Sequence, residues 1–150
     1  MSLEITINND IKAAMIAKDK RKLEALRAIK SALLLIKTGK DTNFAEVPKE
    51  LELKTLQKLI KQRKESAELY KDQGRTDMAE EELYQASIIQ AYLPAQISED
   101  EIKTIIEKII ADTGSSNMKD MGKVMGIASK QLAGKADNKI VSNIVRTLLG

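Results

Sequence analysis

Apolar residues recur at steps of three and four along almost the whole chain, a spacing that places them on one face of an α-helix. Leu3, Ile7 and Ile11 open the first of these stripes, and Ile144 and Leu148 belong to the last. No segment alternates between apolar and polar residues as a strand would. The pattern therefore predicts an all-α fold with seven helices, near residues 3–17, 20–37, 49–72, 77–93, 98–110, 118–133 and 137–148.

Residues that commonly begin helices stand at the expected places. Ser2, Ser98 and Asp137 each precede a predicted helix and can accept a hydrogen bond from one of its free N–H groups. Asp77 should begin the fourth helix in the same way, with Glu80 in the reciprocal position three residues later. Local hydrogen bonding is therefore expected to fix where these helices start.

A break in the pattern at Pro94–Ile97 divides the chain. Pro94 ends the fourth helix, because proline disfavours the helical conformation in the residue before it. We therefore predict an N-terminal four-helix domain over residues 1–94 and a small C-terminal three-helix domain over residues 98–150. A loop is expected at Asp41–Glu46, between the second and third helices.

The composition removes several kinds of chemistry, because the chain has no cysteine and no histidine. Disulfides, thiol catalysis and thiolate metal sites are excluded, and so are the commonest general base and the commonest transition-metal ligand. Neighbouring carboxylates such as Glu65 and Glu68 could in principle act in acid–base catalysis, but the sequence indicates no pocket around them. We therefore predict no catalytic residue, no metal site and no cofactor, and we do not expect the chain alone to be an enzyme.

Charge is distributed unevenly along the chain. The formal net charge of +3 divides into +5 for residues 1–40, −3 for residues 41–97 and +1 for residues 98–150. A basic first segment is compatible with a phosphate-bearing partner. No apolar run approaches the roughly 18 residues of a membrane-spanning helix, and no secretory signal pattern opens the chain. These features predict a cytoplasmic protein that does not associate with a membrane.

The C-terminal part of the third helix holds the densest group of candidate binding residues. Arg63 falls on the apolar stripe, where an arginine must extend to water, pair with an acid or meet an anionic partner. Lys64 and Arg75 are candidates for phosphate contact, and Tyr70 would either stack on a base or belong to the core. A structural alternative stays open, in which these charges pair on the surface or tie the third helix to the acids at Glu80–Glu82.

Gly122 and Gly126 stand four residues apart inside the predicted sixth helix. Each glycine in a helix interior costs about 1 kcal/mol relative to alanine, so the pair needs a reason. Missing side chains let another backbone come close, whether it belongs to a neighbouring helix or to a nucleic acid. Lys119 and Lys123 flank the glycines and keep the second possibility open.

Lys135 lies in the turn Gly134–Asp137, just before a helix N-terminus where backbone N–H groups can receive an anion. A plain glycine turn followed by an aspartate cap would explain the same residues. Arg27 and Lys30, three residues apart on the second helix, are secondary candidates for phosphate contact.

Several motifs occur together in the order and spacing of the GatB/YqeY family, which the chain resembles over nearly its whole length. The motifs are Leu26–Ala32, Ile60–Lys64 with Ser66 and Tyr70, Gly74–Ala79, Tyr92–Pro94, Lys119–Met125 and Gly134–Asp137. Gln85, Lys135 and Asn138 depart from the family's usual glutamate, arginine and glycine.

The resemblance implies kinship with the C-terminal region of the B subunit of glutamine-dependent aspartyl/glutamyl-tRNA amidotransferase. That region is a tRNA-binding appendage without the catalytic parts of the enzyme. The resemblance thus implies a non-catalytic accessory module with tRNA or another structured RNA as its partner. The expected RNA contacts are Arg63, Lys64, Arg75, Lys119, Lys123 and Lys135, with Arg27, Lys30 and Tyr70 as secondary positions.

Two other functions stay open. One is a protein-interaction adaptor for an amidotransferase or synthetase complex in aminoacyl-tRNA metabolism. The other is participation in amide transfer from glutamine, the carbon–nitrogen ligase activity that the family label suggests.

Overall fold

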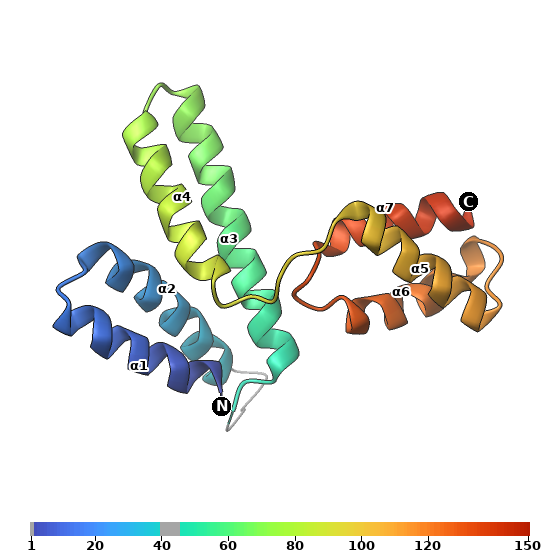
Figure 1. Ribbon diagram of the computed structural model, residues 1–150, viewed down its shortest axis with the longest axis horizontal. Coiled ribbons are helices and arrows are strands. Elements are labelled where there is room, and N and C mark those ends of the chain that lie inside the picture. The colour runs from blue at the N-terminus through green and yellow to red at the C-terminus, as the bar shows by residue number, and fades with distance from the viewer. Residues whose placement is uncertain (1, 40–45) are drawn as a thin grey trace. The chain divides into compact units, whose positions relative to one another are not determined.

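The computed structural model describes residues 2–39 and 46–150 (Figure 1). These residues form seven α-helices and one short 3-10 helix, without a strand, which confirms the all-α prediction. Among them, no helix combines the length and the apolar character needed to cross a bilayer. The loop expected at Asp41–Glu46 lies outside the described residues except for Glu46. The helices are α1 (Leu3–Ile16), α2 (Lys20–Lys37), α3 (Lys49–Asp72), α4 (Thr76–Gln90), α5 (Glu99–Thr113), η1 (Met118–Asp120), α6 (Met121–Gln131) and α7 (Asn138–Leu149).

Contacts within the chain group it into two compact units, Met1–Leu93 and Pro94–Gly150. The first unit contains α1 to α4, and the second contains α5 to α7 with η1. Each unit has its own cluster of buried aliphatic side chains. Each unit therefore has its own source of hydrophobic stabilisation.

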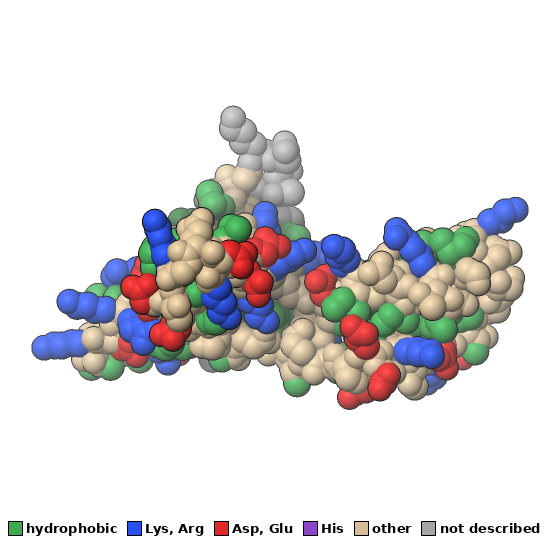
Figure 2. Space-filling view, turned by 90° about the horizontal axis from the view of Figure 1, so that it is seen from above, with side chains coloured by type: hydrophobic (Ala, Val, Ile, Leu, Met, Phe, Trp, Pro, Cys, Tyr) green, Lys and Arg blue, Asp and Glu red, His purple; other side chains and the backbone are tan. Residues whose placement is uncertain are grey.

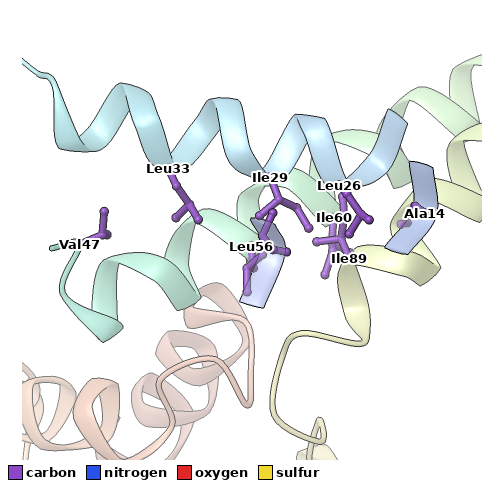
Figure 3. Close-up of a cluster of buried hydrophobic side chains, with 10 residues drawn as sticks. Ala14, Leu26, Ile29, Leu33, Val47, Leu56, Ile60 and Ile89 are labelled. Carbon is purple, nitrogen blue, oxygen red and sulfur yellow. The ribbon is translucent and has the colours of Figure 1, made fainter. Parts of the chain in front are cut away.

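Two helical hairpins, α1–α2 and α3–α4, make up the N-terminal unit (Figure 1). The turn between α1 and α2 is tight, and Lys18 adopts a left-handed conformation there with φ of 57°. Leu26, Ile29, Leu56 and Ile89 are fully buried where the hairpins meet (Figure 3). Burial of a whole aliphatic side chain contributes about 1.5–3 kcal/mol, so this junction holds the hairpins together.

The outer part of the α3–α4 hairpin extends past the α1–α2 hairpin (Figure 1). We call residues 66–80 the arm. Its buried side chains are small, with Ala67 of α3 and Ala79 of α4 only 1% and 0% exposed. The turn at its tip uses Gly74 with φ of 73°, a conformation that favours glycine. The arm is thus a pair of closely packed helices with an alanine seam.

The C-terminal unit packs three helices around an aliphatic core. Ile106 of α5, Val124 of α6, and Val141 and Val145 of α7 are completely buried. Val141 and Val145 are four residues apart on α7, which is the helical periodicity seen in the sequence. The core leaves the opposite faces of all three helices to solvent.

Three of the predicted caps are confirmed. Ser2, Ser98 and Asp137 accept hydrogen bonds from backbone N–H groups two or three residues later, at the starts of α1, α5 and α7. Each satisfies a donor that has no partner within its helix.

Two predicted helix starts are wrong. α4 begins at Thr76, and Arg75 rather than Asp77 occupies the cap position. The reason is the tight turn, in which the Arg75 N–H donates to the Tyr70 carbonyl at 2.7 Å and brings the next residue into the helix. The sixth helix was expected to begin at Met118, but η1 precedes α6, because the side chain of Asn117 accepts from the Lys119 N–H and favours the tighter turn.

Tyr92 links the residues after α4 to α1. Its hydroxyl donates a hydrogen bond of 2.5 Å to Oδ2 of Asp10. Burial raises the pKa of Tyr92, and the hydrogen bond to the Asp10 carboxylate raises it further, because both disfavour the phenolate. Tyr92 is therefore held neutral at a pH where a tyrosine in an unfolded chain ionises.

Replacing Tyr92 by Phe tests this link. We expect a loss of about 1 kcal/mol at neutral pH, the net contribution of a typical hydrogen bond. The wild type should lose stability as the pH rises above about 10, the ordinary tyrosine value, because the unfolded chain then releases a proton that the folded protein retains. The Tyr92→Phe variant should lack this part of the pH dependence. Urea denaturation at neutral and at alkaline pH measures both effects, and equal pH slopes for the two proteins would contradict the assignment.

Candidate nucleic-acid interface

The two glycines of α6 face open space. Apart from the backbone of α6 itself and the adjacent residues, an added Cβ at Gly122 or Gly126 would meet no atom within 4 Å. Close packing against another helix of the described chain, one explanation for the pair, is therefore ruled out. Over the glycines lies a hollow of about 460 Å³, lined by Gly122, Lys123, Gly126, Ile127, Lys130 and Gln131.

Lysines border this hollow. Lys123 and Lys130 line it, seven residues apart on the same face of α6, and Lys119 precedes Lys123 by four residues. All three are exposed, and none forms an ion pair with a residue that the structure describes. The nearby carboxylate of Asp120 accepts a hydrogen bond of 3.0 Å from the Ser116 N–H and forms no ion pair with these lysines. The positive charges of this face therefore stay available to an anion.

The turn between α6 and α7 has a structural role. Gly134 is buried with φ of 74°, and its carbonyl accepts a 2.6 Å hydrogen bond from Nε2 of Gln96. The carbonyl of Lys135 accepts from the Ile97 N–H at 3.1 Å. The motif thus fastens the segment before α5 to the rest of the C-terminal unit. The side chain of Lys135 remains exposed, so an anion contact there is compatible with the structural role.

Arg63 lies just below the arm and is occupied by contacts within the N-terminal unit. Its Nε donates to Oε1 of Gln85 at 3.1 Å, and its Nη1 donates to the Leu59 carbonyl at 3.1 Å. The guanidinium is half-buried and bridges α3 to α4 without an acid. Arg63 therefore has a structural use whether or not it also meets RNA.

The other candidates on the hairpin are more accessible. Lys64 and Arg75 are exposed, and Tyr70 is half-buried on α3. The proposed ties from Arg63 and Arg75 to Glu80–Glu82 do not form, because no ion pair joins these groups in the described chain.

Arg21 is a contact residue that the sequence did not reveal. Its Nη2 lies 2.9 Å from Oε2 of Glu81, its Nε donates to the same oxygen at 3.0 Å, and its guanidinium carbon is 3.9 Å from the centroid of the Tyr84 ring. The hydrogen bond to Glu81 raises the pKa of Arg21. This cluster joins α2 to α4. No sequence signal identifies it, because its partner is 60 residues away.

Other charges are mixed rather than gathered. On the face drawn in Figure 2, basic and acidic side chains are interspersed over the N-terminal unit. Arg27 and Lys30 are exposed on α2. Among the described residues, no three carboxylates lie together in a way that would hold a metal ion. On that face, the cations of the N-terminal unit therefore do not form a continuous basic surface.

The open position of Gly126 makes a testable prediction about stability. Gly126→Ala should stabilise the protein by about 1 kcal/mol, because alanine is the better helix former and its methyl group meets nothing. Gly114→Ala is the matched control, since that residue also meets nothing within 4 Å but has φ of 68°. It should destabilise the protein by about 1–2 kcal/mol. Thermal unfolding measures both, and a destabilising Gly126→Ala would mean that the glycine is needed for packing within the chain.

The chain is similar to proteins named "Altered inheritance of mitochondria protein 41, mitochondrial". It is 34% identical to the Vanderwaltozyma polyspora protein over 122 residues, which cover 77% of this chain and 64% of the relative. It is 34% identical to the Clavispora lusitaniae protein over 125 residues, which cover 82% and 69%. The Pyrenophora tritici-repentis protein is 28% identical over 146 residues, covering 94% and 77%. The chain therefore spans about two thirds of the length of the first two relatives.

These relatives overturn the expectation of a cytoplasmic protein, because their names describe them as mitochondrial. The expectation was drawn from the absence of a secretory pattern and of a membrane-spanning run. Neither of these two absences distinguishes a cytosolic protein from a mitochondrial one.

The resemblance drawn from the sequence motifs is confirmed by a family model. The model describes a YqeY-like protein and matches residues 4–149, so it includes both compact units. The match also includes the glycine pair of α6, the turn at Gly134 and the link at Tyr92. The chain therefore belongs to the YqeY family.

Proposed function

We propose that this protein is a non-catalytic, RNA-binding accessory module whose partner is tRNA or another structured RNA. The observation that supports the proposal most is the exposed glycine pair of α6 beneath a lysine-bordered hollow. A helix that only covered a core would gain stability from alanine at these positions. The two glycines are therefore better explained by a partner outside the chain.

A sugar–phosphate backbone fits the chemistry of this face. Glycine lets a strand approach the backbone of α6, and Lys123 and Lys130 on either side supply positive charge for phosphates. Lys119 and Lys135 are exposed on the same unit and can add contacts. Contacts to phosphate alone give affinity without base specificity, so we propose recognition of RNA shape and charge.

A protein-interaction adaptor is the second candidate function. The same glycine pair supports it, because small residues also allow a partner helix to pack closely. The unpaired lysines favour RNA over this alternative, since desolvating them against an apolar helix would be unfavourable. A role in amide transfer, the third possibility, has no specific observation in its favour.

Binding of tRNA, measured by fluorescence anisotropy at several salt concentrations, tests the proposal. We expect affinity to fall steeply with salt, because bound phosphates release counterions. Lys123→Gln with Lys130→Gln should reduce the salt slope by about two, roughly one for each lost phosphate contact. Gly126→Leu should weaken binding because its side chain fills the hollow, while leucine keeps the helix stable.

The matched control is Lys103→Gln with Lys108→Gln, which removes two exposed lysines from α5 in the same unit. This pair should change the affinity much less than the α6 pair does. Absence of salt-dependent tRNA binding by the wild type would rule out the proposal. A partner that stays bound after nuclease treatment and in high salt would favour the adaptor instead.

We also propose that the units are domains, an N-terminal four-helix domain and a C-terminal three-helix domain. Their separate cores support this. The contacts of Gln96 and Ile97 favour starting the second domain at Pro94 rather than at residue 98. Ile97 also packs against the core of the C-terminal unit.

Expressed alone, residues 1–93 and 94–150 should each fold with a helical circular dichroism spectrum and a cooperative thermal transition. A fragment of residues 98–150 should be less stable than 94–150 by about 1–2 kcal/mol, because it lacks two hydrogen bonds to the α6–α7 turn. Fragments that are unfolded separately and fold only when mixed would contradict two domains.

A further inference from the structure

A stripe of charged side chains runs along the exposed face of α3. Its successive members are separated by four, three, four, three and four residues, so they stay on one side of the helix for about five turns, or about 27 Å. The members are Lys54, Lys58, Lys61, Glu65, Glu68 and Asp72, and all of them are exposed. We call these residues the α3 stripe.

The two signs of charge are separated along the α3 stripe. Lysines fill its first half and acids fill its second half, at matching distances from position 63. The matching pairs are Lys54 with Asp72, Lys58 with Glu68, and Lys61 with Glu65. A half-turn about position 63 therefore exchanges a lysine for an acid at every point of the stripe.

This order of charges does not stabilise α3 itself. Side chains three or four residues apart on a helix are neighbours, and like charges at that spacing are destabilising. Within the stripe, Lys61 and Glu65 are the one neighbouring pair of opposite sign, and the lysine precedes the acid, which is the less favourable orientation. Asp72 lies in the last turn of α3, near the negative end of the helix dipole. The stripe therefore needs an explanation outside the helix.

Other parts of the described chain do not neutralise the α3 stripe. The ion pairs formed by described residues are Arg21 with Glu81 and Lys37 with Glu4. Neither pair includes a member of the stripe. Packing within the described chain therefore does not account for this order of charges.

We propose that the α3 stripe is a docking surface for a second copy of this chain, with the two α3 helices antiparallel about a two-fold axis at position 63. In such a dimer the same surface meets itself, so every contact between two residues occurs twice. The antiparallel register places each lysine of one copy opposite the matching acid of the other. The like-charge neighbours within each helix then lie beside charges of opposite sign.

One exposed apolar side chain borders the α3 stripe. Leu69 lies four residues after Glu65 and three residues before Asp72, so it stands on the edge of the same face. Its side chain is 62% exposed. A helix docked on the stripe would remove part of Leu69 from water, which favours association.

The separation of charge argues against other occupants of this face. An RNA backbone that followed the three lysines would continue onto three acids, which repel phosphates. A second copy in parallel orientation would place lysine against lysine and acid against acid. A different protein would need the opposite order of charges along a helix, and this chain presents that order itself when it is turned end to end.

The dimer should be weak and sensitive to salt. A strip about 27 Å long and about 10 Å wide is much smaller than the roughly 800 Å² per partner of a stable interface. Exposed ion pairs contribute little individually, and salt screens them. We therefore expect a reversible dimer that forms at high protein concentration and low ionic strength.

Small-angle X-ray scattering of the full chain, diluted from about 1 mM, tests this inference. The mean mass should rise towards twice the monomer mass in ~20 mM salt, and the dissociation constant should be at least about tenfold higher in ~500 mM salt, where the Debye length is only about 4 Å. Lys58→Glu with Lys61→Glu should abolish the dimer, and so should Glu65→Lys with Glu68→Lys. An equimolar mixture of these two variants should dimerise again, because each new acid then faces a new lysine.

The control is Lys103→Glu with Lys108→Glu, which makes the same change of net charge at exposed positions of α5. It should leave dimerisation intact, and circular dichroism checks that every variant is folded. A wild type that stays monomeric in low salt overturns the inference, as do stripe variants that dimerise like the wild type or a mixture that stays monomeric. If the wild type is monomeric and the Lys58 and Lys61 substitutions weaken tRNA binding, the stripe serves RNA instead. The scattering experiment contains no RNA, so its result is independent of the proposed function.

Discussion

The packing of α4 against two neighbours at once is the constraint on which the N-terminal unit depends. Ile89 contributes the apolar part of this packing from α4, because it is completely buried in the same cluster as Leu26, Ile29 and Leu56. Arg21 of α2 pairs with Glu81 of α4, and Arg63 of α3 donates a hydrogen bond to Gln85 of α4. These two polar contacts orient α4. The Arg21 side chain is 57% exposed, so water screens its ion pair and the pair contributes little to stability. These contacts select one orientation of α4 more than they stabilise the unit.

The family motifs serve two distinct purposes in this chain. Arg63, Tyr92 and Gly134 each join separate segments through hydrogen bonds, so they preserve the fold. Gly122 and Gly126 have no such role within the described chain. At position 85 the chain has glutamine where the family usually has glutamate. Gln85 accepts from Arg63 as a neutral amide, which leaves the charge of the guanidinium uncompensated beside the arm.

Local features were predictable from the sequence, and contacts between distant segments were not. Helix periodicity and caps such as Ser98 depend on residues within a few positions, so a sequence pattern contains them. The prediction of Asp77 as the cap of α4 is wrong, because the Arg75 N–H donates to the Tyr70 carbonyl in the turn and Arg75 takes the cap position. The contact of Arg21 with Glu81 depends on how two hairpins pack, which no periodicity describes. Lys119 and Lys123 were candidates from the sequence, whereas Lys130 joins them only in the structure, because its place beside the hollow depends on how α6 is exposed.

The alanine seam gives the N-terminal unit a gradient of local stability. A buried methyl group excludes far less apolar surface from water than a buried isoleucine, so separating the helices at Ala67 and Ala79 costs much less than opening the junction at Ile29 and Ile89. Fluctuations that expose backbone amides should therefore begin at the tip around Gly74 and stop near Glu81 and Gln85. The same two helices would then behave as a firm scaffold at one end and as an adaptable element at the other.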